Sequence, residues 1–212
     1  ATTSLHPLDD ALALTPGAAD IFPGRTTAPY WNMVGPFGGI TAATLLQAVM
    51  QHPARLGEPL SMTVNYAGAI AEGAFEVQAT PLRTNRSTQH WSITLRQIGK
   101  DGAPQVMTSA TAVTAARRNT WSATDLPMPR VPAPEACAQV EQAIAVQWVN
   151  RYAMRPVTGM PPARWDGAEG DSLSQLWVRD TPGRTLDFPA LAALCDVFYP
   201  RVWRRRALQV PA

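Results

Sequence analysis

The chain has 212 residues, of which 46% are hydrophobic and 16% charged, and its formal net charge is +2. A chain of this length and apolar content can bury a core, which excludes a wholly disordered protein. The basic residues form no long run, and their densest cluster is Arg201 with 204–206, so we expect no nucleic-acid partner.

The cysteine and histidine content points to a reduced, cytoplasmic protein without a metal. Cys137 and Cys195 are too few for a disulfide scaffold, and they lack the spacing of metal ligands. Residues 26–54 carry no charge, but prolines, glycines and polar residues interrupt them before the roughly 18–20 apolar residues that a membrane span needs. The N-terminus has no basic start and no apolar core, so we expect neither a signal peptide nor a membrane partner.

The first expected elements are two short strands at 10–15 and 19–26, with a turn at Pro16-Gly17 between them. A helix follows. It begins at Gly38-Gly39 and runs towards Pro53, because apolar residues recur every three to four positions. This helix carries almost no charge on any side, which is typical of a helix enclosed by other structure.

Four strands are expected after the helix. Apolar and polar residues alternate in three segments: Leu60, Met62, Val64 and Tyr66; Phe75, Val77 and Ala79; Trp91, Ile93 and Leu95. A period of two is typical of half-buried strands. A hairpin turn at 99–102 leads into a fourth strand at 105–116, and short turns between consecutive strands predict an antiparallel sheet.

The pattern then breaks and restarts. Residues 118–142 are rich in proline and are interpreted as a semi-rigid linker. Beyond it we expect a strand at 143–158, where Ile144, Val146 and Trp148 alternate, and another at 171–179. Asp187 is a plausible N-cap for a short helix that ends before Tyr199-Pro200. Its expected apolar stripe is Leu191, Leu194 and Phe198.

The order of elements suggests a duplication. The segment 45–53 resembles 192–200, and the same elements precede both, so we divide the chain into a first repeat at 1–117, a linker at 118–142 and the start of a second repeat at 143–212. The second repeat lacks its later strands in this sequence, which would leave sheet edges unpaired. We therefore expect a homo-oligomer, or completion by a further chain segment.

An apolar helix cradled by an antiparallel sheet, in tandem, resembles the double hotdog, an α+β fold. The segments 31–40, 59–66, 106–110 and 194–201 are similar to those of the TesB-like acyl-CoA thioesterases, and they occur in the expected order. The resemblance implies a hydrolase of bacterial lipid metabolism that acts on acyl-CoA thioesters and needs no cofactor.

The resemblance also implies where the chemistry lies. The acid on the central helix of the family's second hotdog falls on Asp196, and its Thr or Ser and Gln partners would lie beyond residue 212. The first repeat has Gln47 or Val49 near the position of the acid, so the second repeat would carry the reaction. A carboxylate at Asp196 could deprotonate the attacking water. The structural alternative is a helix-end Asp that pairs with Arg201 or faces solvent.

Other candidate substrate-binding residues have equally ordinary explanations. Gly38 and Gly39 could present backbone N–H groups to a carbonyl oxygen, or they could simply allow a tight turn or close packing. The strand residues Thr63, Asn65 and His90 could line a pocket or face solvent. Arg201 could meet the phosphates of CoA or belong to a solvated face.

Three functions remain from the sequence. The first is an acyl-CoA thioesterase in which Asp196 activates water. The alternative is a non-catalytic hotdog module that binds acyl groups or serves in assembly. A hotdog hydratase is weaker, because no histidine lies near Asp196. Acyl-chain length depends on packing that the sequence pattern does not fix.

Overall fold

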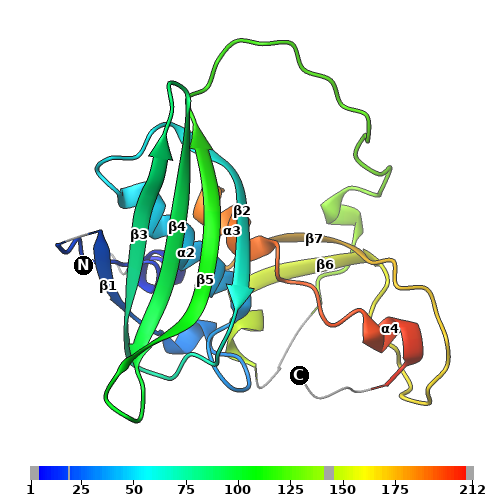
Figure 1. The fold of residues 1–212 in the computed structure, drawn as a ribbon. Helices are drawn as coiled ribbons and strands as arrows, with labels where there is room; N and C mark the ends of the chain where they lie inside the picture. Colours follow the sequence, from blue (N-terminus) through cyan, green and yellow to red (C-terminus); the bar gives the residue numbers. More distant parts are fainter. Residues whose placement is uncertain (1–4, 19, 141–145, 209–212) are drawn as a thin grey trace.

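The computed structural model describes residues 5–18, 20–140 and 146–208, and its main feature is a five-stranded antiparallel sheet curved along one helix (Figure 1). The strand order is β1-β3-β4-β5-β2. The strands are β1 (Ile21–Arg25), β2 (Glu58–Tyr66), β3 (Ala74–Thr84), β4 (Thr88–Ile98) and β5 (Pro104–Ala115). Helix α2 (Gly38–Gln51) lies against the sheet. The expected helix and the four strands after it are confirmed.

The segment before β1 differs from the expectation. Residues 10–15 were expected to form a strand, but Pro7–Ala11 form helix α1. Proline fits the first turn of a helix, and the Nδ1 atom of His6 accepts a hydrogen bond from the Leu8 amide and so caps it. Burial of Leu8 and Ala11 on one helical face outweighs the local alternation that suggested a strand. Residue 19, in the second expected strand, lies outside the described residues.

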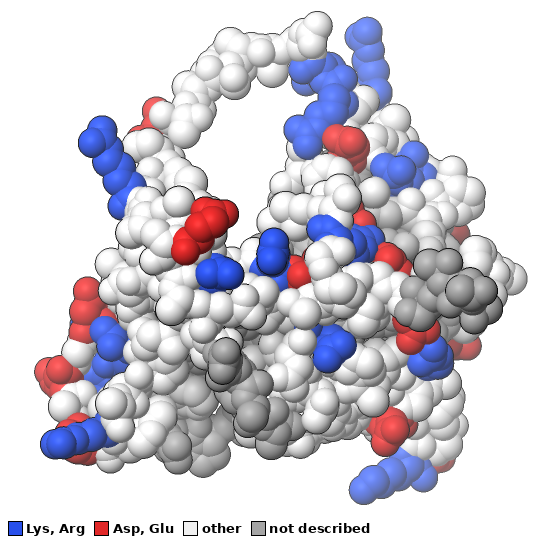
Figure 2. Space-filling model, turned by 180° about the vertical axis from the view of Figure 1, so that it is seen from behind, with Lys and Arg blue, Asp and Glu red and all other residues white. Residues whose placement is uncertain are grey.

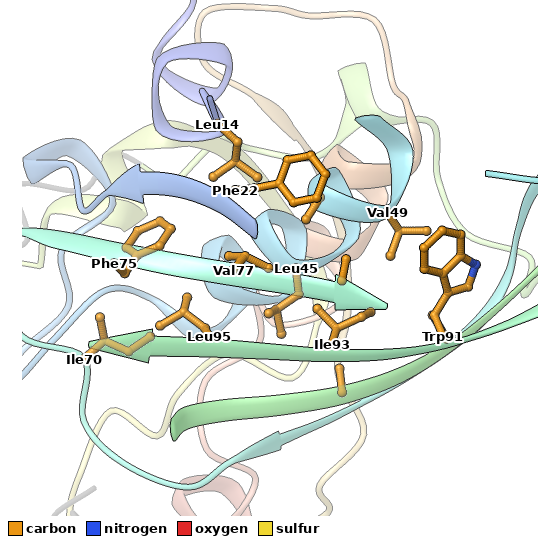
Figure 3. Close-up of a cluster of buried hydrophobic side chains, with 14 residues drawn as sticks. Leu14, Phe22, Leu45, Val49, Ile70, Phe75, Val77, Trp91, Ile93 and Leu95 are labelled. Carbon is orange, nitrogen blue, oxygen red and sulfur yellow. The ribbon is translucent and has the colours of Figure 1, made fainter. Parts of the chain in front are cut away.

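The core of this unit lies between α2 and the sheet (Figure 3). The alternating residues of β3 and β4 point into it as expected, and Val77, Trp91 and Ile93 are almost fully buried. On α2, Leu45 and Val49 complete the contact. Because residues are buried along nearly the whole of α2, the uncharged helix is an enclosed one, as its composition indicated.

Strand β2 is an edge strand, and its alternation is only partly reflected in burial. Met62 and Val64 pack against the core, whereas Leu60 is 56% and Tyr66 54% exposed. Of the four alternating apolar residues, only the two in the middle of the strand therefore contact the core. An edge strand has one neighbour, here β5, so its end residues lack cover from a second strand.

The second unit contains a two-stranded antiparallel sheet, β6 (Tyr152–Thr158) and β7 (Gln175–Asp180), and the short helices α3 (Phe188–Leu194) and α4 (Val202–Arg206). The strand expected at 143–158 was wrong in its first part. Val146 precedes a 3-10 helix at Gln147–Arg151, and Ile144 lies outside the described residues. Trp148 turns out of the expected strand face to stack on Phe37, with ring centroids 4.2 Å apart.

Helices α2 and α3 pack together and join the two units through a second core, in which residues from both sides are buried. Asp187 caps α3 as expected, because its carboxylate accepts a hydrogen bond from the Ala190 amide. The expected stripe was only partly right: Leu194 packs against the second core, whereas Leu191 is 48% exposed and Phe198 lies beyond the helix. The buried face instead consists of Pro189, Ala190 and Ala193, whose small size brings the two helices close.

Between the units, the proline-rich segment arches away from the body (Figures 1 and 2). Residues 117–130 have no regular structure and are exposed throughout, including Trp121 and Leu126. A single turn of 3-10 helix, Pro134–Ala136, follows where the chain returns to the second unit. Among the described residues, no helix is both long and apolar enough to cross a membrane.

Candidate active site

Asp196 lies in the turn that directly follows α3. It was expected on the helix itself, but α3 ends at Leu194, and the Asp196 amide donates to the carbonyl of Ala193 at 3.2 Å. This short turn directs the carboxyl group across the helix pair to the first residue of α2. The end of one helix and the beginning of the other, more than 150 positions apart in the chain, thus form one site.

Gly38 leaves the space that the Asp196 carboxyl occupies. A Cβ atom built on Gly38 would lie 2.5 Å from Oδ2 of Asp196 and 3.4 Å from the hydroxyl oxygen of Tyr66. The first distance is far below a normal contact, so the carboxylate has its present position because residue 38 has no side chain. Two polar side chains from different elements therefore face the same point at the start of α2.

The beginning of a helix is a favourable place for this carboxylate. The first N–H groups of an α-helix have no partner inside the helix, and they carry partial positive charge. Burial raises the pKa of the Asp196 carboxyl above its usual range, while the backbone N–H of Gly39 acts in the opposite direction. The Gly38 N–H has no acceptor among the residues that the structure describes. It is available to a ligand oxygen.

Tyr66 is a site residue that sequence reasoning missed. It lies at the end of β2, and its hydroxyl donates to the carbonyl oxygen of Gly38 at 2.8 Å. Burial, and secondly the charge of Asp196, raise the pKa of Tyr66 to about 12, so the phenol is neutral near pH 7. Its place in the alternating pattern of β2, on the same face as Val64, was the available signal, but that pattern suggested a core residue.

Gly39 has a different role from Gly38. A Cβ atom on Gly39 would lie 2.4 Å from the backbone oxygen of Ala193 and 2.4 Å from the ring of Phe37. The close approach of α2 to α3 thus requires glycine at this position. Of the two readings that the sequence left open, the geometry around Gly39 fits close packing, and the geometry around Gly38 leaves room for a polar group.

Three expected substrate-binding residues are not brought to Asp196. Thr63 and Asn65 are exposed on the face of β2 opposite Met62 and Val64, which pack against the core. His90 is likewise exposed on β4, between buried neighbours that point inward. Successive strand residues face opposite sides of a sheet, so these side chains lie on the surface away from α2.

Arg201 is held within the second unit. Its guanidinium donates to the carbonyl of Tyr199 at 2.8 Å and lies over the Tyr199 ring at 4.5 Å from the centroid. It also donates to the hydroxyl of Ser174, and together with Phe198 it lines an open hollow of about 760 Å³. Of the two structural alternatives for Asp196, the pairing with Arg201 is absent, because in the described part of the chain no ion pair involves either residue. The other alternative holds in part: Asp196 is an exposed residue, although its carboxyl lies against Gly38.

The described residues contain no group of three or more His, Cys, Asp or Glu side chains that could hold a metal ion. The groups that the structure brings together at the site are one carboxylate with a raised pKa, the unpaired amide of Gly38 at a helix start and a neutral phenol. Such a set can accept a proton from water and donate hydrogen bonds to an oxygen that gains negative charge.

Two family models match the chain. The acyl-CoA thioesterase N-terminal domain matches residues 27–115, and the acyl-CoA thioesterase C-terminal domain matches residues 128–211. No curated protein matches the sequence.

Solved structures share the fold. A conserved protein of unknown function with a hot dog fold from Alicyclobacillus acidocaldarius is 45% identical, with a TM-score of 0.88 over 98% of this chain and 75% of that one. An acyl-CoA thioesterase II from Mycobacterium marinum is 19% identical, with a TM-score of 0.67 over 90% of this chain and 68% of that one. A tesB protein from Mycobacterium avium subs paratuberculosis is 18% identical, with a TM-score of 0.65 over the same shares. The latter two likenesses concern the fold alone.

Proposed function

The chain belongs to the acyl-CoA thioesterase family, with tandem domains of the hotdog fold, and from this premise we propose that it hydrolyses acyl-CoA thioesters with Asp196 as the general base. The observation that carries the proposal is the position of the Asp196 carboxylate against Gly38 at the beginning of α2. A base and unpaired amide donors at one point are what acyl transfer to water requires.

In the first step, the Asp196 carboxylate takes a proton from a water molecule, and the oxygen of that water adds to the thioester carbonyl carbon. The raised pKa of Asp196 makes the carboxylate a stronger base than an ordinary aspartate. Water attacks directly in this scheme, with Asp196 as the base, and no covalent acyl-enzyme is formed.

In the second step, the tetrahedral intermediate collapses. Its negatively charged oxygen accepts a hydrogen bond from the free N–H at the start of α2, for which we propose Gly38. The carbon–sulfur bond then breaks, and the CoA thiolate takes the proton held by Asp196, which gives free CoA and the carboxylic acid. The carboxylate of Asp196 is regenerated for the next cycle.

The decisive experiment is the Asp196→Asn variant. Asparagine keeps the size of the side chain but cannot accept the proton, so we expect at least a 100-fold loss of kcat, in the range that general-base groups contribute. The measurement is the decrease in thioester absorbance with a panel of acyl-CoA substrates of different chain length. Asp125→Asn, in the exposed linker, is the matched control and should retain wild-type turnover.

The pH dependence gives a second test. Activity should fall as the pH drops through the pKa of Asp196, and because burial raises that pKa, the acid limb should lie above the 3.8 of an ordinary aspartate. Wild-type turnover in the Asp196→Asn variant would contradict the proposal. Binding of acyl-CoA without hydrolysis by the wild type would instead favour a non-catalytic acyl-binding module.

A further inference from the structure

Arg184 joins the beginnings of two helices that belong to different units. Its Nε and Nη2 atoms donate to Oδ1 of Asp9 at 3.0 and 2.8 Å, and Nη2 also donates to Oδ2 of Asp187 at 2.6 Å. Asp9 lies in the first turn of α1, and Asp187 is the N-cap of α3. The side chain of Arg184 is only 18% exposed, so these bonds are partly shielded from water. We call the three side chains the Arg184 clamp.

A second contact holds the same two segments together. The Nδ1 atom of His6 accepts from the Leu8 amide, so a neutral ring carries its proton on Nε2, which donates to the carbonyl oxygen of Pro182 at 2.8 Å. Pro182 lies two residues before Arg184, in the segment that leads into α3. The beginning of α1 therefore contacts the chain at the beginning of α3 at two points.

The direction of α3 decides where Asp196 lies. The buried face of this seven-residue helix carries a proline and two alanines, and the backbone oxygen of Ala193 meets Gly39. Small side chains form shallow ridges, so such a contact brings two helices close without fixing the angle between them. At a rise of roughly 1.5 Å per residue, Asp187 lies about 9 Å before Ala193 along the helix, and Asp196 about 4–5 Å after it. A displacement at the clamp thus moves Asp196 by about half as much.

We propose that Arg184 is a positioning residue for the reaction: by holding Asp9 and Asp187 together, it sets the direction of α3 and so keeps the Asp196 carboxylate beside Gly38. This role rests on the proposed function of Asp196 as the base. Arg184 lies at the opposite end of α3 from Asp196 and does not itself touch the reacting atoms.

The clamp keeps its charges where Asp196 titrates. Its bonds with Asp187 and Asp9 raise the pKa of the Arg184 guanidinium above an already high value. Burial acts to raise the pKa of Asp187, but the bonds from Arg184 and from the Ala190 amide outweigh it, and the pKa lies below its usual range. Because the same carboxylate caps α3 and accepts from Arg184, the clamp acts on the helix directly.

The test is Asp9→Ala, which releases the clamp from α1 and leaves the cap of α3 in place. A displacement of about 0.5 Å at the base should lower kcat about tenfold and leave KM unchanged, because binding does not need the base. Burial is the larger influence on the pKa of Asp196, so a displaced, less buried carboxyl should move the acid limb of the pH–rate profile to lower pH. Asp9→Glu keeps the carboxylate and should restore most of the activity.

Asp10→Ala is the matched control. It removes the same charge from the same turn of α1, but Asp10 pairs with Arg25 at 2.7 Å, inside the first unit. Its kcat and its acid limb should stay those of the wild type. If Asp10→Ala lowers kcat as much as Asp9→Ala does, or if Asp9→Ala changes only the midpoint of urea denaturation, Arg184 has no positioning role.

A carbon-13 NMR titration of the Asp196 carboxyl, in the protein without substrate, separates this role from the proposed function. The pKa of Asp196 should be lower in Asp9→Ala than in the wild type, whether or not the protein hydrolyses acyl-CoA. An unchanged pKa would overturn the role of Arg184 alone, whereas an active Asp196→Asn variant would overturn the proposed function.

Discussion

Gly38 and Gly39 are neighbours in the chain, but the space around each is restricted by a different kind of atom. Next to Gly38 is the end of the Asp196 side chain, which can rotate away. Next to Gly39 is the backbone oxygen of Ala193, which cannot move without the helix that carries it. The same substitution should therefore affect activity at one position and stability at the other.

We predict that Gly38→Ala folds normally and hydrolyses acyl-CoA about 100-fold more slowly. The added methyl group would lie 2.5 Å from Oδ2 of Asp196, so the carboxylate must move, and a displacement of about 1 Å in a catalytic group can cost this factor. Alanine also favours a helix more than glycine does, so the free energy of unfolding should not decrease. Urea denaturation and steady-state kinetics measure the two effects, and wild-type kcat in this variant would contradict the placement of the base.

At the scale of elements, the site depends on how closely α3 approaches α2. The contact is made by Gly39 on one helix and by Ala190 and Ala193 on the other, so no long side chain separates the two backbones. Next to it, the stacked rings of Phe37 and Trp148 fill the space at the start of α2. This packing fixes the turn that carries Asp196 relative to the first amides of α2.

We predict that Gly39→Ala destabilises the protein by about 1–3 kcal/mol, the usual cost of overpacking a core. The new Cβ atom would meet the Ala193 oxygen and the Phe37 ring at 2.4 Å, and relief requires the helices to move apart. The measurement is the midpoint of urea denaturation, with Gly38→Ala as the matched control. Equal stability of the two variants would contradict this prediction, because it would show that α2 and α3 can move apart without lowering the free energy of unfolding.

Elements with a long, regular period could be predicted from the sequence. Helix α2 and strands β3 and β4 each bury one consistent set of residues, so hydrophobic burial and local periodicity agree. Shorter elements could not be predicted in this way. Helix α1 lies where a strand was expected. The cap by His6 and burial against the second unit make this segment helical, and the local alternation of residues indicates neither. In α3, the small Ala193 and not the large Leu191 is buried, because the neighbouring helix dictates the contact.

At the scale of the whole molecule, tertiary packing creates the site. The sequence predicted several of its residues, but it did not predict that they lie next to one another. Asp196 and the two glycines were candidates, but nothing local joins residues so far apart in the chain. They meet because the second core contains side chains from both units, including Phe37 and Ile40 from the first and Tyr152 and Ala193 from the second. An ion pair of Arg184 with Asp9, at 2.8 Å, adds a polar contact across the same junction.

This arrangement predicts that the two units stay together when the linker between them is cut. Residues 117–130 are exposed and irregular, so trypsin should cleave first after Arg117, Arg118 or Arg130, where an extended chain fits a protease more readily than the hairpins do. The two fragments should then elute together in size-exclusion chromatography and separate only in denaturant, because the shared core keeps its burial. An Arg117→Gln, Arg118→Gln, Arg130→Gln triple variant should resist this first cleavage. Fragments that separate without denaturant would show that the linker, and not the packing of α2 on α3, holds Asp196 at its site.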